Sequence, residues 1–331
     1  MKVIIDSAIP FVRGILEPWA EVVYCGGSAI TREVVRNADA LVVRTRTRCD
    51  RELLEGSRVQ FIATATIGRD HIDEAYCRGA GINVVSAAGC NARGVLQWVA
   101  AALKHLLAVD GCCPQHRKLG VVGVGNVGSL VVEYARHWGF DVLMCDPPRK
   151  ECEGGDFVSI EEIARSCDII TLHTPLDDST HHLVNDKLLD MMRHDAVIIN
   201  ASRGPVVDGV AVAESSHRYM FDVWEGEPNL DTLCLERAIL ATPHIAGYSL
   251  QGKANATAMS VNALADYFGL PLSKWYPEGV TPSKPRLISW DEMCATIDDY
   301  CPILEQTNSL KSSPNNFESM RNNYSYREEY F

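Results

Sequence analysis

Short apolar runs recur along the N-terminal part of the chain, each about as long as a buried β-strand. Segments with helical spacing of apolar residues separate them, for example 31–38 and 71–80. The runs predicted as strands are 2–7, 21–25, 38–45, 59–66 and 82–87. Such regular alternation of strand and helix favours a parallel α/β sheet.

A second series of apolar runs begins near residue 118. Its predicted strands are 118–125, 141–146, 167–174, 196–202, 219–224 and 238–244. Ser159 is followed three residues later by Glu162, a capping box that predicts a helix start at Ser159. Between the two series, residues 91–109 are almost wholly apolar and predict a buried helix at the boundary of two lobes. We therefore expect an α/β protein with two doubly wound, Rossmann-like parallel sheets.

Composition and charge narrow the class of protein. The chain has 331 residues, of which 47% are hydrophobic and 22% charged, and no apolar run approaches the roughly 18 residues of a membrane span. The formal net charge of −12 disfavours a nucleic-acid partner, which needs cations for binding. The first residues lack the features of a signal peptide, which predicts a cytoplasmic protein without a membrane partner.

Cysteine and histidine patterns point to neither disulfides nor a metal. The twelve cysteines are scattered without a C-x-x-C pair, which favours free thiols. The ten histidines show no H-x-x-x-H spacing, and His181 and His182 lie in a polar segment that is typical of a surface loop. We therefore expect no metal site.

The strongest local motif is G-x-G-x-x-G at Gly123, Gly125 and Gly128, directly after a predicted strand and at the start of a predicted helix. Glycines here permit a tight turn and close approach of a pyrophosphate to the helix N-terminus. The alternative is a glycine-rich turn without a ligand. Asp146 ends the next strand, where a carboxylate accepts hydrogen bonds from ribose hydroxyls and favours NAD over NADP. Its alternative role is that of a turn residue.

Three ionisable residues follow later strands, at the sheet edge where open α/β sheets bind ligands. The guanidinium of Arg203 suits bidentate binding of a carboxylate. Glu227 precedes Pro228, and His244 offers an imidazole for proton exchange near neutral pH. Each has a structural alternative as a surface or strand-end residue, but together behind a nucleotide turn they favour a catalytic set.

The succession GVGNVG, CDPP, HTP, INASRGPVVD, FDVWEGEP and TPHIAGYS resembles the D-isomer-specific 2-hydroxyacid dehydrogenases. A finer resemblance, to the members of vitamin B6 biosynthesis that oxidise 4-phospho-D-erythronate, rests on RTRTR, FIATATIGRDHID, AAGCNA, DVWEGEP, HIAGY and the tail FESMRNNYSYRE. The family resemblance implies a substrate-binding lobe over 1–92 completed by about 250–272, an NAD-binding domain over 93–249, and a C-terminal dimerisation region over 273–331 that forms a homodimer.

The resemblance also implies roles for matching residues. Arg203 would hold the substrate carboxylate, His244 would take the C2 hydroxyl proton, and Glu227 would orient His244. NAD contacts would come from the glycine turn and from residues at the following strand ends: Gly123, Gly125, Asn126, Val127, Gly128, Asp146, Thr174, Ala201, Ser202, Arg203, Asp222 and Gly247. Substrate contacts would fall at Thr45, Thr66 and Tyr248.

An anionic substrate needs a local cationic cluster in so acidic a chain. Period-2 alternation over 44–48 predicts Arg44, Arg46 and Arg48 on one side of a strand. We hypothesise that one or more of these three arginines contacts the 4-phosphate, with Arg69 as a further candidate, the alternative being a solvated basic strand end. The residues leave open whether Arg321 or Arg327 reaches a partner's active site.

One segment departs from the family pattern. Between Asp208 and Phe221 the chain is several residues shorter than the helix, turn and strand that the family places there. We expect the catalytic set to survive this deletion and cofactor binding or stability to weaken. Two other functions stay open: another phosphorylated D-2-hydroxyacid dehydrogenase, such as D-3-phosphoglycerate dehydrogenase, and a non-catalytic NAD-sensing interaction protein. The sequence also leaves open whether NADH is exchanged or is reoxidised in place by a 2-keto acid.

Overall fold

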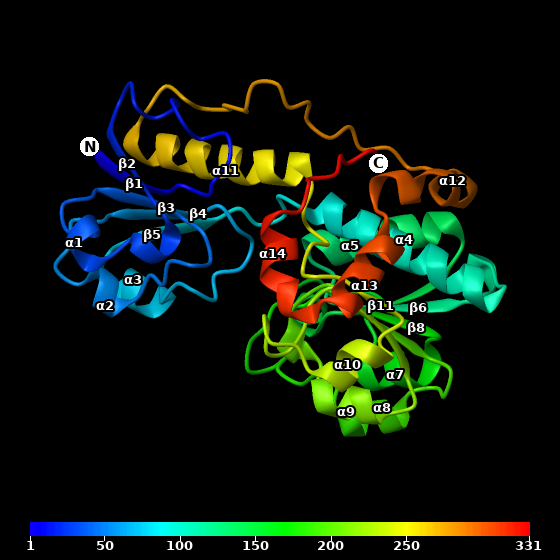
Figure 1. Cartoon of the computed structure of the whole chain (residues 1–331). Helices are drawn as coiled ribbons and strands as arrows, with labels where there is room; N and C mark the ends of the chain where they lie inside the picture. Colours follow the sequence, from blue (N-terminus) through cyan, green and yellow to red (C-terminus); the bar gives the residue numbers. More distant parts are fainter. The chain divides into compact units, whose positions relative to one another are not determined.

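Two sheets organise the computed structural model, which describes all of residues 1–331. The first unit comprises 1–91 and 250–282, and the second comprises 92–249 and 283–331 (Figure 1). All strand pairs in both sheets are parallel, which confirms the predicted α/β class with two parallel-sheet lobes. The C-terminal region expected over 273–331 is divided between the two units.

The first unit contains a five-stranded sheet in the order β2-β1-β3-β4-β5, the flavodoxin-like strand order. Its elements are β1 (Lys2–Asp6), β2 (Glu21–Cys25), α1 (Arg32–Val35), β3 (Ala40–Val43), α2 (Arg51–Leu54), β4 (Phe61–Thr64), α3 (Glu74–Gly79), β5 (Asn83–Ser86) and α11 (Leu250–Phe268). The central strands β3 and β4 are buried throughout because apolar side chains cover both faces of the sheet. Val261 and Leu264 of α11 belong to the cluster on one face, which ties α11 to this unit.

The strand expected to carry the arginine alternation is shorter than predicted. β3 ends at Val43, and residues 44–47 turn back so that the Thr47 N–H donates to the Arg44 carbonyl over 3.1 Å. The predicted placement of Arg44, Arg46 and Arg48 on one side of a strand is therefore wrong. The physical reason lies at Thr47, whose buried hydroxyl donates to the Gly27 carbonyl and bends the chain inward.

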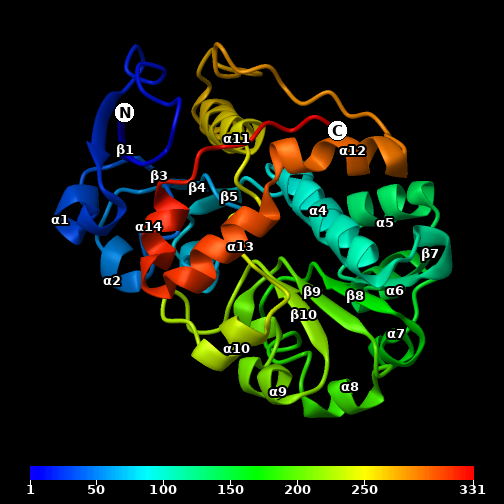
Figure 2. The same cartoon turned by 45° about the vertical axis from the view of Figure 1, so that its right-hand side comes forward.

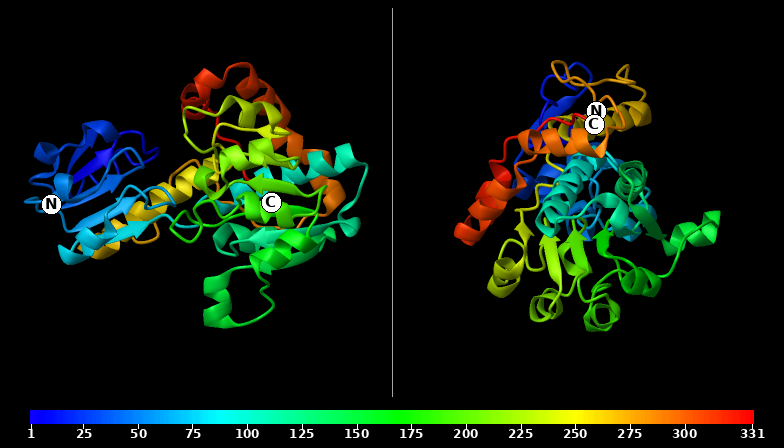
Figure 3. Two further views of the ribbon diagram at one scale, coloured as in Figure 1. Left: turned by 90° about the horizontal axis from the view of Figure 1, so that it is seen from below. Right: turned by 90° about the vertical axis from the view of Figure 1, so that its right-hand side faces the viewer.

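The second unit contains a six-stranded sheet in the order β11-β10-β9-β8-β6-β7. The strands are β6 (Lys118–Val122), β7 (Asp141–Cys145), β8 (Ile169–Leu172), β9 (Val197–Asn200), β10 (Arg218–Phe221) and β11 (Leu240–Ala241). A single bridge between Met144 and Phe157 extends the β7 edge. Figure 3 shows the strands of this sheet, coloured green, between helices on both sides.

Helices cover the two faces of the second sheet with separate apolar clusters. They are α4 (Ala92–Asp110), α5 (Asn126–Trp138), α6 (Pro147–Glu153), α7 (Ile160–Ser166), α8 (Asp186–Met191), α9 (Gly209–Glu214), α10 (Thr232–Arg237), α12 (Trp290–Tyr300), α13 (Ile303–Ser312) and α14 (Phe317–Asn322). The predicted helix over 91–109 is confirmed as α4, most of whose residues are buried, and it packs against α5 and α12 (Figure 2). None of these helices has the length and apolar character needed to cross a membrane.

Local signals decided two helix starts. Ser159 is the N-cap of α7 and accepts from the Glu162 N–H, as the capping box predicts. In the shortened segment, Asp208 caps α9, which ends after six residues. β10 nevertheless pairs with β9 over its whole length, from Arg218 to Phe221. The short segment after Asp208 therefore still forms the strand that precedes Asp222.

Candidate active site

Six parallel strands of the second unit end at one edge of the sheet, and each is followed within a few residues by a predicted site residue. In the order β7, β6, β8, β9, β10 and β11, these residues are Asp146, Gly123, Thr174, Arg203, Asp222 and His244. The carboxyl ends of parallel strands form the ligand edge of an open α/β sheet. The structure therefore gathers the predicted cofactor and catalytic residues of the second unit along one edge.

The glycine turn joins β6 to α5 with almost no space for side chains. Gly123 has a φ of +82° and its N–H donates to the Cys145 carbonyl over 2.8 Å. A Cβ at Gly128 would lie 1.9 Å from the Gly123 carbonyl oxygen, so only glycine lets the helix approach the turn. At Gly125, by contrast, a Cβ would meet no atom within 4 Å. The space beside Gly125 is that left for a pyrophosphate in such turns.

Asp146 is held in place at the end of β7. Its Oδ2 accepts from the Val124 N–H over 2.8 Å, and its Oδ1 caps α6 through the Arg149 N–H. A carboxylate has about four acceptor positions, so two stay available for ribose hydroxyls. The nearby Arg149 guanidinium makes two hydrogen bonds with Glu153. Because the Glu153 carboxylate neutralises the charge of Arg149, this arginine is not free to bind a 2′-phosphate. The surroundings of Asp146 therefore favour NAD over a 2′-phosphorylated cofactor.

The ends of β8 and β9 supply a polar atom without a partner and a rigid loop. The Thr174 hydroxyl is buried and has no hydrogen-bond partner within the protein. After β9, the Asn200 side chain accepts from Ser202 and donates to the Arg203 carbonyl, which closes the loop 200–203. The buried hydroxyl of Thr174, which lacks a hydrogen bond, costs free energy unless a ligand bonds to it. The residues present therefore fit an NAD molecule bound along this edge.

His244 and Glu227 form a close pair. Nδ1 of His244 lies 2.8 Å from Oε2 of Glu227, and the other carboxylate oxygen accepts from the Trp224 N–H. Burial raises the pKa of Glu227, but the hydrogen bond and charge of His244, the Trp224 N–H and the charge of Arg321 outweigh it, so the pKa lies below its ordinary value. Glu227 therefore stays ionised and fixes the imidazole ring through Nδ1.

Asp222 holds the loop that carries His244. Its buried carboxylate accepts from the Thr242 hydroxyl over 2.5 Å and from the N–H groups of Ile245 and Ala246. Burial raises the pKa of Asp222 above its ordinary value, although these hydrogen bonds and the charge of His244 oppose the shift. His244 itself has a φ of +58°, a conformation that a non-glycine residue keeps only where its surroundings impose it.

Residues at the C-terminal end of the chain also hold the loop that carries His244. Arg327 is buried, and its guanidinium donates to the carbonyls of Gly94, Ile245 and Ala246. Glu329, also buried, accepts from the Ser249 hydroxyl over 2.6 Å. The C-terminal residues thus belong to the scaffold of the His244 loop in the same chain.

The side chain of Arg321, on α14, lies close to Tyr248 and to Glu227, the residue that pairs with His244. Its Nε donates to the Tyr248 hydroxyl over 3.2 Å, and its Nη1 lies 4.0 Å from Oε2 of Glu227. The side chain keeps 30% of its surface exposed, so its charge faces solvent as well as the pair. Arg321 is therefore a cation beside the candidate catalytic pair of its own chain.

The remaining predicted substrate residues lie in the first unit. Arg44 is half-buried and donates to the Ala8 carbonyl over 3.3 Å, whereas Thr45 and Arg46 are exposed on the turn after β3. The Thr66 hydroxyl follows β4 and lies 2.6 Å from the Thr64 hydroxyl. Arg69 is paired with Glu74 at 3.4 Å. The first unit therefore presents the turn after β3 and the segment after β4 at the carboxyl ends of neighbouring strands.

Residues 96–246 match the family model of the D-isomer specific 2-hydroxyacid dehydrogenase NAD binding domain. An erythronate-4-phosphate dehydrogenase of Bacteroides thetaiotaomicron is 44% identical over 340 residues, covering 99% of this chain and 97% of the relative. One of Pseudomonas savastanoi is 45% identical over 280 residues, covering 82% of this chain and 74% of the relative. The chain belongs to the erythronate-4-phosphate dehydrogenase family.

A solved structure supports the fold of this family member. The NAD⁺-bound 3-phosphoglycerate dehydrogenase of Entamoeba histolytica has a TM-score of 0.68 at 24% identity, covering 85% of this chain and 99% of that chain. At this identity the likeness concerns the fold. Together with the family match, the prediction of an NAD-dependent dehydrogenase of the D-isomer-specific 2-hydroxyacid class is confirmed.

Sequence reasoning missed the intramolecular roles of Arg321 and Arg327 in this family member. Both arginines lie in the aromatic and polar C-terminal tail. Their positive charge in that segment is the only local feature of the sequence that could have indicated a functional role. Arg203 and His244 were located because they follow the carboxyl ends of parallel strands. Neither Arg321 nor Arg327 follows a strand, so this rule does not identify them. Their contacts depend on how α14 and the last residues return to the second unit.

Proposed function

We propose that the chain oxidises 4-phospho-D-erythronate at C2 to (R)-3-hydroxy-2-oxo-4-phosphobutanoate, on the route to pyridoxal 5′-phosphate. The observation that carries the proposal is the pairing of His244 with Glu227 at the same sheet edge as the glycine turn. An acid–base group fixed beside a dinucleotide site suits the oxidation of an alcohol. The identity of the relatives supports the particular substrate.

In this proposal His244 is the general base. With Nδ1 held by Glu227, its Nε2 is available to take the proton of the C2 hydroxyl. The ionised Glu227 stabilises the imidazolium that results. NAD, when bound, supplies the acceptor for the hydride that leaves C2.

Cofactor contacts in the proposal come from residues along the sheet edge. The N–H groups around Gly125, Asn126 and Val127 would bind the pyrophosphate, and Asp146 would bind the ribose. The unpaired Thr174 hydroxyl and the loop of Ala201, Ser202 and Arg203 border the same edge. Asp222 and Gly247 would complete the set of cofactor-binding residues.

In this proposal, separate arginines bind the carboxylate and the phosphate of the substrate. Arg203 binds the carboxylate and polarises the C2 oxygen, and its Nη1 is steadied by the Ser202 carbonyl at 2.8 Å. Tyr248, Thr45 and Thr66 contact the substrate. Arg44 or Arg46, on the turn after β3, meets the phosphate. Arg321 is a positioning residue, because it acts through Glu227 and Tyr248.

The proposal extends to assembly and location. We propose a homodimer built on the C-terminal region 273–331, whose exposed apolar side chains Leu287, Leu304 and Tyr326 support an interface. Light scattering after gel filtration would show twice the chain mass, and a monomer would contradict this part. We further propose a cytoplasmic enzyme with a small-molecule substrate and neither nucleic acid nor membrane as partner, which the net charge of −12 supports.

The deciding experiment measures NADH formation with 4-phospho-D-erythronate, 3-phospho-D-glycerate and D-lactate in parallel. A 2-keto acid is added to one set, because it would reoxidise tightly held NADH and reveal hidden turnover. We expect kcat/KM to favour the four-carbon phosphate by about tenfold or more, roughly 1.4 kcal/mol of transition-state discrimination. Preference for 3-phosphoglycerate would contradict the proposed substrate and indicate a 3-phosphoglycerate dehydrogenase. Bound NAD without any turnover would support a cofactor-sensing protein instead.

A further inference from the structure

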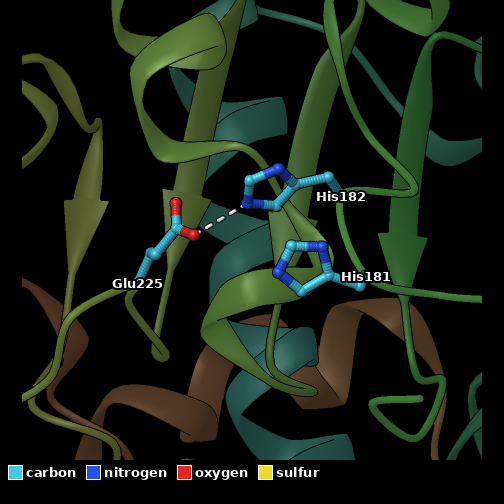
Figure 4. Close-up of side chains that lie close together, drawn as sticks. All are labelled: His181, His182 and Glu225. Atoms are coloured by element: carbon cyan, nitrogen blue, oxygen red, sulfur yellow. Dashed lines mark hydrogen bonds and ion pairs between the residues drawn. The ribbon is translucent and has the colours of Figure 1, made fainter. Parts of the chain in front are cut away.

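Two histidines and a glutamate meet at the ligand edge of the second sheet, outside the candidate catalytic set (Figure 4). His181, His182 and Glu225 each offer one donor atom, and these atoms lie within 4.8 Å of one another. Nε2 of His182 is 2.7 Å from Oε1 of Glu225. The two imidazole rings stack with centroids 4.1 Å apart.

The backbone holds the two histidines in this position. His182 has a φ of +47°, its N–H donates to the Pro205 carbonyl, and its own carbonyl accepts from the Asn185 side chain. Glu225 follows β10, 43 residues further along the chain. A strained residue held by hydrogen bonds on both sides marks a position that its surroundings over-determine. The convergence of the three side chains therefore follows from defined loops.

Outer contacts orient two of the three donors. Nδ1 of His182 lies 3.5 Å from Oδ2 of Asp208, which leaves Nε2 directed at Glu225. The second oxygen of Glu225 accepts from the Gly209 N–H over 3.1 Å. A histidine that binds a metal usually has its other ring nitrogen held by a carboxylate or carbonyl, and ligating carboxylates are themselves hydrogen-bonded. Here Glu225 has such a hydrogen bond, and Asp208 faces the other ring nitrogen of His182 at ion-pair distance.

We propose that His181, His182 and Glu225 form a binding site for a divalent transition-metal ion, with Zn²⁺ as the preferred ion. Two imidazoles and one carboxylate are a common donor set for Zn²⁺, and a fourth position is left for water. His181 is exposed and Glu225 is 37% exposed, so the ion can enter from solvent. The site is independent of the proposed dehydrogenase reaction.

Binding must replace the hydrogen bond between His182 and Glu225. Two ligand atoms about 2.0 Å from a tetrahedral ion lie roughly 3.3 Å apart, so this pair has to separate by about half an ångström. His181, which is exposed, supplies the third donor by a small movement of its ring.

The ion would tie together three segments of the second unit: the loop before α8, the loop before α9 through Asp208, and the residues after β10. Pro205, which accepts from His182, lies two residues after Arg203, and Glu225 lies two residues before Glu227. A bound ion would therefore stiffen the loops next to the candidate catalytic residues. Its role in this proposal is structural.

The test titrates the full-length protein, freed of metal by chelation, with Co²⁺ followed by its visible absorption and with Zn²⁺ followed by calorimetry. We expect one ion per chain with a Kd of about 1 µM or tighter. His181→Ala and Glu225→Gln should each weaken binding by about tenfold or more, and Asp208→Asn, which retains the helix cap, by about tenfold.

Matched controls separate this site from others. His194→Ala removes an exposed histidine on another loop, and Cys113→Ser removes a thiol that lies 3.2 Å from Nδ1 of His116. Both variants should bind like the parent protein. The proposal is overturned if the parent binds no ion below about 100 µM. It is equally overturned if Cys113→Ser abolishes binding while His181→Ala, folded by circular dichroism, does not change it.

Discussion

The guanidinium of Arg321 lies 4.0 Å from the carboxylate oxygen of Glu227 that holds His244. The same arginine donates to the hydroxyl of Tyr248, which lies four residues after His244 in the chain. A tail residue thus adds a positive charge beside the candidate catalytic pair of its own chain. This differs from the alternative in which Arg321 serves only a partner's site.

Arg321→Ala should lower kcat/KM by about tenfold, equivalent to roughly 1.4 kcal/mol. The variant loses one cause of the lowered pKa of Glu227, so that pKa should rise. The acid limb of the kcat/KM profile should then move to higher pH, since Glu227 is protonated sooner on acidification. Arg321→Lys should keep most of the acid limb but lose the bond to Tyr248.

Arg286→Ala is the matched control, because Arg286 is a more exposed arginine of the same C-terminal region and pairs with Glu292. Its pH profile should equal that of the parent. An unchanged acid limb in Arg321→Ala would show that the arginine does not act through Glu227.

His244→Ala should lower kcat by about 10²- to 10⁴-fold, since a positioned general base contributes that much. Glu227→Gln should lower kcat less, because the amide can still contact Nδ1 but carries no charge. NADH affinity, measured by fluorescence, should be unchanged in both variants. If the parent turns over and His244→Ala retains its rate, the assignment of His244 as the base is wrong.

Two alanine substitutions in the glycine turn should separate stability from cofactor binding. Gly128→Ala places a Cβ 1.9 Å from the Gly123 carbonyl oxygen, so α5 must move, and we expect a loss of about 3 kcal/mol in the free energy of unfolding. Gly125→Ala meets no atom within 4 Å and should fold normally. Its methyl group would occupy the space of the pyrophosphate, so NAD affinity should fall. Urea unfolding and NADH titration distinguish the two outcomes, and normal NAD binding by Gly125→Ala would contradict the placement of the cofactor.

Arg327→Met should destabilise the second unit by about 3 kcal/mol, because the buried carbonyls of Gly94 and Ile245 lose their charged donor. Loosening of residues 244–248 should accompany this, seen as faster hydrogen exchange at the Ile245 and Ala246 amides. Unaltered exchange there would show that Asp222 alone holds the loop.

Asp110 gives a pH dependence of stability. Hydrogen bonds and charge from Arg218, with the charge of Arg117, hold the pKa of Asp110 below its ordinary value against the opposing effect of burial. A carboxyl group whose pKa is lowered by folding stabilises the protein above its unfolded pKa, and that contribution disappears as pH falls through the folded pKa.

Asp110→Asn should therefore lower the unfolding free energy by about 1–2 kcal/mol at pH 7, a value reduced because Arg218 is a third exposed. The difference from the parent should shrink below about pH 4 as Asp110 becomes protonated. Urea unfolding at several pH values checks this, and a difference that stays constant to pH 3 would contradict it.

Local patterns in the sequence predicted much of the second unit. Gly123, Gly128 and Asp146 follow strands, and Ser159 caps its helix, because hydrophobic periodicity and capping depend on residues a few positions apart. The same rule placed Arg203 and His244 at the ligand edge, since parallel strands end together. The first unit was less predictable: the alternation over 44–48 failed where the buried Thr47 hydroxyl turned the chain.

The sequence by itself determined the two parallel sheets, the nucleotide turn and the candidate catalytic residues at the strand ends. Only the tertiary structure decided that Arg321 reaches Glu227, that Arg327 holds the His244 loop, and that Glu225 meets His181 and His182. These contacts join residues far apart along the chain, and no periodicity or spacing encodes them. They arise when loops and the C-terminal tail pack on the finished sheet, so their geometry follows from the packing of the second unit as a whole.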